Sequence, residues 1–125
     1  MNEWVRRAVR SRAADRCEYC GLKQEDSVLA ALHVEHIIPK KHGGTDDLEN
    51  LALACVDCNL HKGPNLTGID PTSGQVAALF NPRQQSWREH FEWQGITIMG
   101  KSVTGRTTVR VLDMNSEDQL SLRSS

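Results

Sequence analysis

Apolar positions follow helical spacing at the start of the chain and strand-like runs further on. In the first sixteen residues, one helical face collects the apolar residues Val5, Ala8, Val9 and Ala13. Residues 29–38 are rich in apolar and β-branched types and stop at Pro39, which predicts a strand. A loop over 40–44 and a short apolar run over 51–54 follow, and a helix after Cys58 is expected to end at Gly63 and Pro64.

The second half of the chain places apolar elements between polar connections. Residues 65–73 are rich in turn-forming types and predict a surface connection. Trp87 and Phe91, four residues apart, predict a helix between Pro82 and Trp93. Alternating runs over 96–99 and 107–112 predict a closing hairpin, and the polar tail from Asn115 is expected to fray. We interpret Trp87 and Trp93 as core aromatics, with base stacking as the alternative.

Composition is that of one ordinary globular domain. The chain has 125 residues, of which 38% are hydrophobic and 25% charged, so disordered and low-complexity classes are excluded. No stretch approaches the roughly 18 apolar residues that span a bilayer, and the N-terminus lacks the apolar core of a signal peptide. We therefore expect a cytoplasmic protein without a membrane partner.

The formal net charge of -1 conceals an uneven distribution. Residues 1–16 carry five arginines against two acids, whereas residues 17–62 carry four lysines against eight acids. Residues 63–110 are again basic, with five cations against three acids. The distribution leaves room for a nucleic-acid partner that the average charge would argue against.

Four cysteines form two pairs with the same two-residue spacer, Cys17 with Cys20 and Cys55 with Cys58. Two such knuckles supply the four thiolates of a tetrahedral structural zinc site. The alternatives are two disulfides, which a cytoplasmic compartment disfavours, and two redox motifs, which would be unusual in so small a chain. Zinc held by four cysteines has no open position, so any chemistry must come from other residues.

Between the cysteine pairs, Glu35 and His36 are neighbours on the expected strand. Successive strand side chains point to opposite faces, so the two residues would not easily share one metal. They could instead divide the work, with Glu35 holding a hard cation and His36 acting on a substrate.

The full array resembles the HNH endonucleases. In order, it contains the cysteine pairs, the Glu-His-Ile-Ile-Pro run at 35–39, the double glycine at 43–44, the Leu-Glu-Asn-Leu run at 48–51 and Cys-Asn-x-x-Lys at 58–62. The resemblance implies an α+β fold with a small ββα-metal core of two antiparallel strands and a helix. We divide the chain into a basic helix (1–16), this core (17–64), a helix-and-hairpin extension of the same domain (65–114) and a polar tail (115–125).

The resemblance also assigns roles to residues. It implies that His36 is the general base, that Asn50 orients the loop carrying it, and that Glu35 and Asn59 bind a catalytic divalent metal. The chain departs from the commonest pattern in having Asn59 where the family often has His, and Glu35 where it often has Asp. Carboxylate and amide oxygens are hard ligands and favour Mg²⁺ or Mn²⁺ over zinc.

The implied reaction is hydrolysis of DNA phosphodiester bonds, most simply in double-stranded DNA. Candidates for substrate contact are Lys40, Lys41 and Lys62, while His33 and His61 are weaker candidates for the site. Two alternatives stay open at this point: a non-catalytic zinc module that binds nucleic acid or protein, and an HNH nuclease acting on RNA. The sequence does not choose between a monomer and a homodimer.

Overall fold

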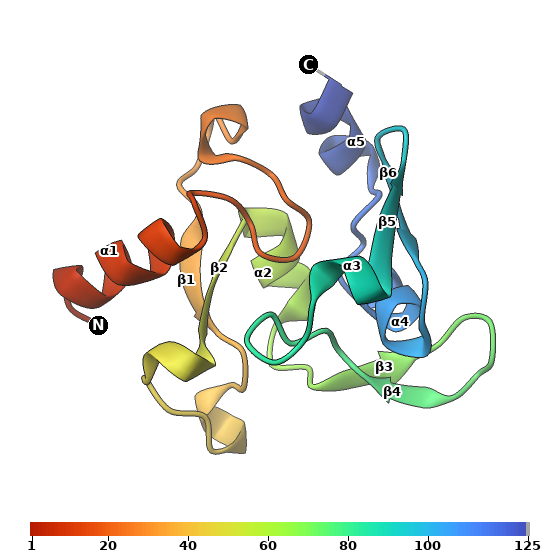
Figure 1. The fold of residues 1–125 in the computed structure, drawn as a ribbon, viewed down its shortest axis with the longest axis horizontal. Helices are drawn as coiled ribbons and strands as arrows, with labels where there is room; N and C mark the ends of the chain where they lie inside the picture. The colour runs from red at the N-terminus through yellow and green to blue at the C-terminus, as the bar shows by residue number, and fades with distance from the viewer. Residues whose placement is uncertain (125) are drawn as a thin grey trace.

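The computed structural model describes residues 1–124 and has the predicted α+β fold (Figure 1). The N-terminal half consists of α1 (Glu3–Arg12), β1 (His33–His36), β2 (Leu51–Ala54) and α2 (Val56–Lys62). Single-turn 3₁₀ helices interrupt its loops: η1 (Gln24–Asp26), η2 (Lys40–His42) and η3 (Leu48–Asn50). Strands β1 and β2 pair antiparallel, with Glu35 opposite Ala52 and His36 opposite Leu51.

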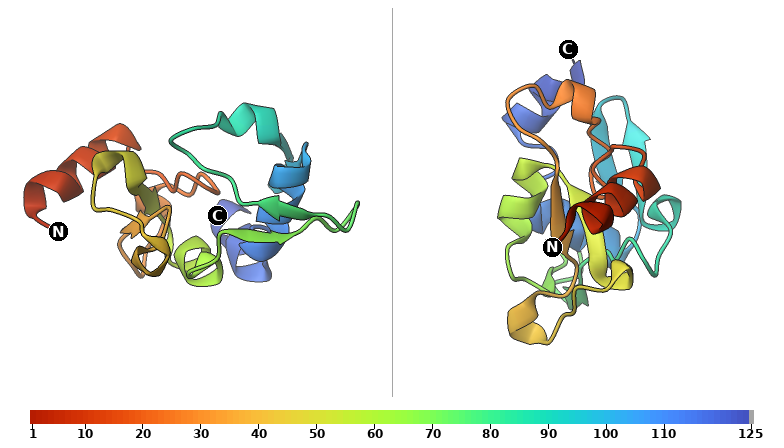
Figure 2. Two further views of the ribbon diagram at one scale, coloured as in Figure 1. Left: turned by 90° about the horizontal axis from the view of Figure 1, so that it is seen from below. Right: turned by 90° about the vertical axis from the view of Figure 1, so that its left-hand side faces the viewer.

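The C-terminal half adds two more antiparallel strand pairs and three helices. These elements are β3 (Thr67–Ile69), β4 (Val76–Ala78), α3 (Trp87–His90), β5 (Phe91–Gln94), β6 (Thr97–Gly100), α4 (Val103–Val111) and α5 (Glu117–Ser124). Helix α4 contacts β3, β4 and β6. Helix α1 and the β3–β4 hairpin lie at opposite ends of the molecule, and α2 lies between its two halves (Figures 1 and 2).

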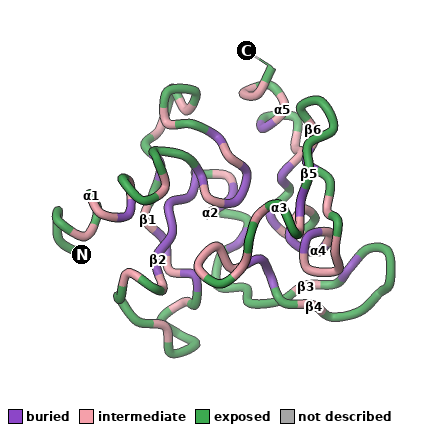
Figure 3. The backbone as a smooth tube through the Cα atoms, in the orientation of Figure 1, coloured by how far each residue is buried: buried purple, intermediate pink, exposed green. Residues whose placement is uncertain are grey.

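The core follows β2, all four of whose residues are buried (Figure 3). Val9 is the buried residue of α1, and α1 contacts both β1 and β2. Buried aromatic and aliphatic residues continue this cluster into the C-terminal half: Phe80, Phe91, Ile98, Leu112 and Met114. Among the described residues, no helix has both the length and the apolar character needed to cross a bilayer.

Two predicted elements of the N-terminal half are shorter than expected. Helix α1 ends at Arg12, and the chain then turns through Ala14 and Asp15, whose φ angles are 54° and 53°. Strand β1 begins only at His33, and the apolar Leu29 is 97% exposed. An apolar run alone therefore does not make a strand here, because residues 29–32 have no strand partner.

Several predictions for the C-terminal half are wrong. Residues 67–69 and 76–78 form a hairpin where a connection was expected, and the helix predicted between Pro82 and Trp93 is confined to Trp87–His90. Strand β6 pairs with β5, and residues 103–111 are helical. Two threonines fit within this helix because the hydroxyls of Thr107 and Thr108 donate hydrogen bonds to carbonyls one turn earlier. The tail is helical as well, as α5.

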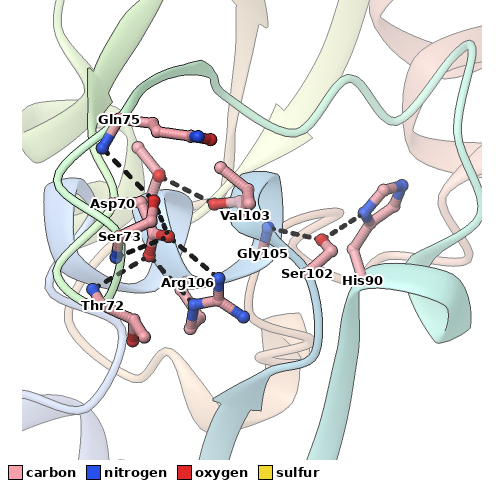
Figure 4. Close-up of polar contacts among 10 residues, drawn as sticks. Asp70, Thr72, Ser73, Gln75, His90, Ser102, Val103, Gly105 and Arg106 are labelled. Atoms are coloured by element: carbon pink, nitrogen blue, oxygen red, sulfur yellow. Dashed lines mark hydrogen bonds and ion pairs between the residues drawn. The ribbon is translucent and has the colours of Figure 1, made fainter.

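A buried carboxylate fastens the turn after β3 to α4 (Figure 4). Asp70 accepts two hydrogen bonds of 2.9 Å from the Arg106 guanidinium, and its side chain also accepts from the backbone N–H groups of Thr72 and Ser73. The bidentate geometry is the strong form of this ion pair. A second contact in the same view joins His90 Nδ1 to the hydroxyl of Ser102, which caps α4, at 2.7 Å.

The Asp70 network should make stability depend on pH. Hydrogen bonds from Arg106 and Ser73 hold the pKa of Asp70 well below its ordinary value, so the folded state favours the ionised form. This contribution is present above the unfolded pKa of about 4 and is lost as pH falls further. We expect the thermal midpoint of the wild type to fall more steeply below about pH 4 than that of Asp70→Asn. Equal slopes of the thermal midpoint against pH in the two proteins would contradict this account. The control is Glu92→Gln, a substitution at an exposed position of β5.

Candidate functional site

His36 stands at the end of β1 and faces away from the core. Its side chain is partly exposed, and its Nε2 lies 2.7 Å from Oδ1 of Asp46. The ammonium of Lys40 lies 3.0 Å from the other oxygen of Asp46. Hydrogen bonding to His36 and then to Lys40 lowers the pKa of Asp46, so this carboxyl is ionised at neutral pH. Lys41 and His42, the next residues of η2, are exposed.

Asn50 closes the loop that follows β1. Its Oδ1 accepts from the backbone N–H of Ile38 at 2.9 Å, and its Nδ2 donates to the carbonyls of Ile38 and Thr45 at 3.0 and 2.8 Å. Gly44 permits this closure, because a Cβ there would lie 1.7 Å from the Ile38 carbonyl oxygen and 2.9 Å from Asn50 Nδ2. The amide thus ties η3 to the segment directly after His36.

Glu35 points to the opposite face and is buried. Oε1 accepts from the hydroxyl of Tyr19 at 2.5 Å, and Oε2 lies 3.3 Å from the ammonium of Lys62. Burial raises the pKa of Glu35, and the opposing effects of Lys62 and Tyr19 do not cancel that rise. Both oxygens of the expected metal ligand therefore already have protein partners.

Lys62 does not lie on the surface, so the prediction that it contacts a phosphate is wrong. Its side chain is 2% exposed, and its ammonium also donates to the carbonyls of His36 and Ile37 at 3.2 and 3.0 Å. These two bonds and the Glu35 contact match the three hydrogens of an ammonium. Helical spacing correctly placed Lys62 one turn after Asn59, but it could not show that α2 turns this position toward β1.

The other candidate residues lie along β1 and α2. Asn59 is half-buried on α2, and the structure leaves its assignment as a metal ligand a prediction. His61 is exposed, and its Nδ1 lies 2.8 Å from the Asp57 carbonyl of its own helix. His33 is exposed at the first position of β1, opposite Ala54. The geometry therefore joins His36 to Asp46 and Lys40, and Glu35 to Tyr19 and Lys62, as two separate groups.

The four cysteines converge as predicted. Their sulfur atoms all lie within 4.8 Å of one another, and all four residues are buried and free of disulfides. In each knuckle, the backbone N–H of the second cysteine donates to the sulfur of the first, at 3.5 Å for Cys20 and 3.4 Å for Cys58. Four converging sulfurs fit tetrahedral zinc.

The crowding of the sulfurs shifts the pKa of Cys17 and that of Cys55 in opposite directions. Burial raises the pKa of Cys17, whereas hydrogen bonds from Cys17, Cys20 and Cys58 lower that of Cys55. These hydrogen bonds favour the thiolate form of Cys55. A metal bound by all four sulfurs would displace the protons of those that are still thiols.

Residues 17–65 match the family model described as "HNH endonuclease". This segment belongs to the HNH endonuclease family. Across 119 residues the chain is also 26% identical to the Septu protein PtuB of Bacillus thuringiensis, a match that covers 94% of this chain and 43% of that protein. The chain thus spans less than half the length of this relative. No solved structure gives a significant match.

The structure gives three residues contacts with the candidate site or the cysteine cluster that the sequence patterns did not assign to them. No role at the site was predicted for Asp46 or for Tyr19. Gln119 lies in the tail expected to fray, yet it is fully buried, and its Nε2 lies 3.4 Å from the sulfur of Cys55. The same amide lies 3.7 Å from the sulfur of Cys20 and 3.9 Å from that of Cys58. Amide donors of this kind stabilise thiolate ligands from outside the metal shell.

The buried pair in the HNH segment leads to a stability prediction. Lys62→Met removes the cation and leaves the Glu35 carboxylate buried, which should lower the free energy of unfolding by about 3–5 kcal/mol. Urea denaturation would measure the loss. The double variant Glu35→Gln with Lys62→Met should recover much of it, because no buried charge remains. Lys41→Met on the exposed η2 is the matched control, and an equal loss in that variant would contradict the prediction.

Proposed function

We propose that the HNH segment hydrolyses phosphodiester bonds in DNA, with His36 as the general base and a divalent metal bound by Glu35 and Asn59. The observation that carries the proposal is the position of His36 within this family segment. Its imidazole is partly exposed, paired with a carboxylate and mounted beside a loop that Asn50 closes. An oriented imidazole open to solvent is what proton abstraction from water requires.

Asp46 selects the tautomer of this base when its imidazole is neutral. A carboxylate can only accept, so the contact at 2.7 Å requires a hydrogen on His36 Nε2 and leaves the lone pair on Nδ1. Nδ1 is then the atom that takes a proton from the attacking water. The Asp46 carboxylate holds the ring and stabilises the imidazolium that forms, as the acidic member of a catalytic triad does.

The donor chemistry at Glu35 and Asn59 fits a hard divalent cation. Carboxylate and amide oxygens suit Mg²⁺ or Mn²⁺, and Glu35 Oε2 already faces a cation in Lys62. Glu35 would hold a metal only if the Lys62 ammonium, which now neutralises the carboxylate, moved away from it. When bound, such a metal supplies charge neutralisation at the phosphate and at the leaving oxygen.

Exposed lysines are the candidates for contact with the substrate backbone away from the scissile bond. Lys41 is exposed on η2, and Lys40 is exposed beside it while paired with Asp46. Both lie in the loop that follows β1, just before His42 and the double glycine. We infer that their ammonium groups contact phosphates on either side of the scissile bond.

The proposal is tested by incubating the zinc-loaded protein with supercoiled plasmid, single-stranded DNA and RNA of matched length. Each substrate is tested with Mg²⁺, with Mn²⁺ and without added divalent metal, because a chelator would also strip the zinc. We expect DNA cleavage that requires the added metal and leaves 5′-phosphate and 3′-hydroxyl ends that a ligase can rejoin. Folded protein that cuts no substrate with either metal would indicate a non-catalytic zinc module, and cleavage of RNA alone would reassign the substrate.

A further inference from the structure

A cavity of about 370 Å³ opens between the end of α1, the first cysteine knuckle and the segment entering α3. Two indoles line it: the ring centroids of Trp87 and Trp93 lie 5.7 Å apart, with their planes inclined by 33°. The Trp87 indole N–H donates to the Tyr19 carbonyl at 2.8 Å, which fixes its orientation. Trp93 is 47% exposed, so it is not the core aromatic that the sequence predicted. The guanidinium of Arg123, which does not line the cavity, lies over the Trp93 ring at 5.5 Å from its centroid.

Cations gather at the same cavity. Arg12, Arg16 and Glu18 line it, and Glu18 is paired with Arg83. The carboxylate of Glu18 is thus taken up by Arg83, and the two arginines that line the cavity outnumber its one acid. Burial and the nearby Arg83 lower the pKa of Arg12, as expected for crowded cations. Arg83 Nη1 is also buried without a hydrogen-bond partner among the described residues.

The cavity is joined to the proposed hydrolytic site through Arg12. Its guanidinium donates to the carbonyls of Leu48 and Leu51, at 2.9 and 2.5 Å. These two residues flank the segment of η3 that contains Asn50, the residue that closes the loop after His36. Arg12 therefore links the loop that follows His36 to a cavity that offers both indole rings and arginine side chains.

We propose that this cavity binds one nucleotide of the nucleic-acid strand that the HNH segment cleaves, with the base stacked on Trp93 and the phosphate at Arg12 and Arg16. Every base has a π face, so stacking on an indole holds a strand without reading its sequence. Arginine suits the phosphate because its planar fork binds two phosphate oxygens at once. The inference rests on the proposed function, since it assumes a nucleic-acid substrate.

The test is strand binding, separated from cleavage. Zinc-loaded protein carrying His36→Ala is titrated into a short fluorescein-labelled single-stranded DNA, and affinity is followed by anisotropy. Adding Trp93→Ala should weaken binding by roughly 5- to 100-fold. Adding Arg16→Ala should weaken it and lower the slope of log K against log salt by about one. Trp4→Ala and Arg7→Ala, two exposed positions of α1 outside the cavity, are the matched controls and should bind like the parent.

A strand with abasic positions separates stacking from a structural effect. If Trp93 stacks on a base, the parent protein and the Trp93→Ala protein should bind the abasic strand with the same affinity. The proposal would be overturned if Trp93→Ala left binding of the intact strand unchanged, or if it weakened binding of the intact and the abasic strand by the same factor. Binding of a free mononucleotide as tight as that of the strand would also overturn it. Metal-dependent DNA cleavage by protein that retains His36 would leave the proposed function standing in each of these cases.

Discussion

Replacement of Cys55 by serine is expected to unfold the protein. Structural zinc contributes about 10 kcal/mol or more of apparent folding free energy, while domains of this kind are stable by only about 5–15 kcal/mol. The cysteines are also part of the core itself, beside Leu53 and Tyr19. Without the metal, four sulfurs would have to share one buried space without a cation between them. Loss of the metal should therefore remove most or all of the stability.

Circular dichroism and elemental analysis would test this prediction together. Wild-type protein should contain one zinc per chain and lose its helical signal when a strong chelator is added, and excess zinc should restore the signal. Cys55→Ser should lack both zinc and a cooperative thermal transition. Leu60→Ser, a substitution at a 74% exposed position of the same helix, controls for changes to α2 itself. A folded, zinc-free Cys55→Ser protein would show that the sulfur cluster is not a structural metal site.

Replacement of His36 by alanine should abolish most DNA cleavage while leaving the fold intact. A positioned general base contributes about 10²- to 10⁴-fold to rate, and we expect kcat to fall within that range. The pair with Asp46 is solvent-accessible, so its loss should cost little stability. The variant should therefore keep its zinc content and its thermal midpoint.

Two further measurements make this expectation specific. Added imidazole should partly restore cleavage by His36→Ala, because a free base can enter the space that the side chain has left. His42→Ala removes an exposed histidine six residues away and should cut DNA at the wild-type rate. Cleavage by His36→Ala within twofold of the wild type would rule out His36 as the base.

Metal-ligand spacing and local motifs predicted the N-terminal half well. The two cysteine pairs converge because a knuckle is a local structure, complete within four residues and closed by its own N–H to sulfur bond. The α2 helix and the antiparallel pairing of β1 with β2 also agree with the expectation. The roles of the individual HNH residues stay predictions, to be tested by the experiments above.

The errors fall where tertiary contacts decide the structure. Alternation over 107–112 indicated a strand, but packing of α4 against β3, β4 and β6 outweighs the β propensity of its threonines and valines. Lys62 was expected on the surface because lysine usually is, and only the positions of Glu35 and two carbonyls explain its burial. The contact between His36 and Asp46 joins residues ten positions apart across an irregular loop, so no periodic pattern in the sequence predicts it.

The amide of Gln119 has a consequence for the order in which the molecule is assembled. Its sulfur contacts reach back 61 residues to Cys58 and 99 residues to Cys20. During synthesis, all four ligands leave the ribosome well before α5 exists. Metal that binds at this stage enters a half-open cluster, and α5 closes over it afterwards. The newly made chain thus passes through an interval in which oxidants and competing chelators can reach the sulfurs.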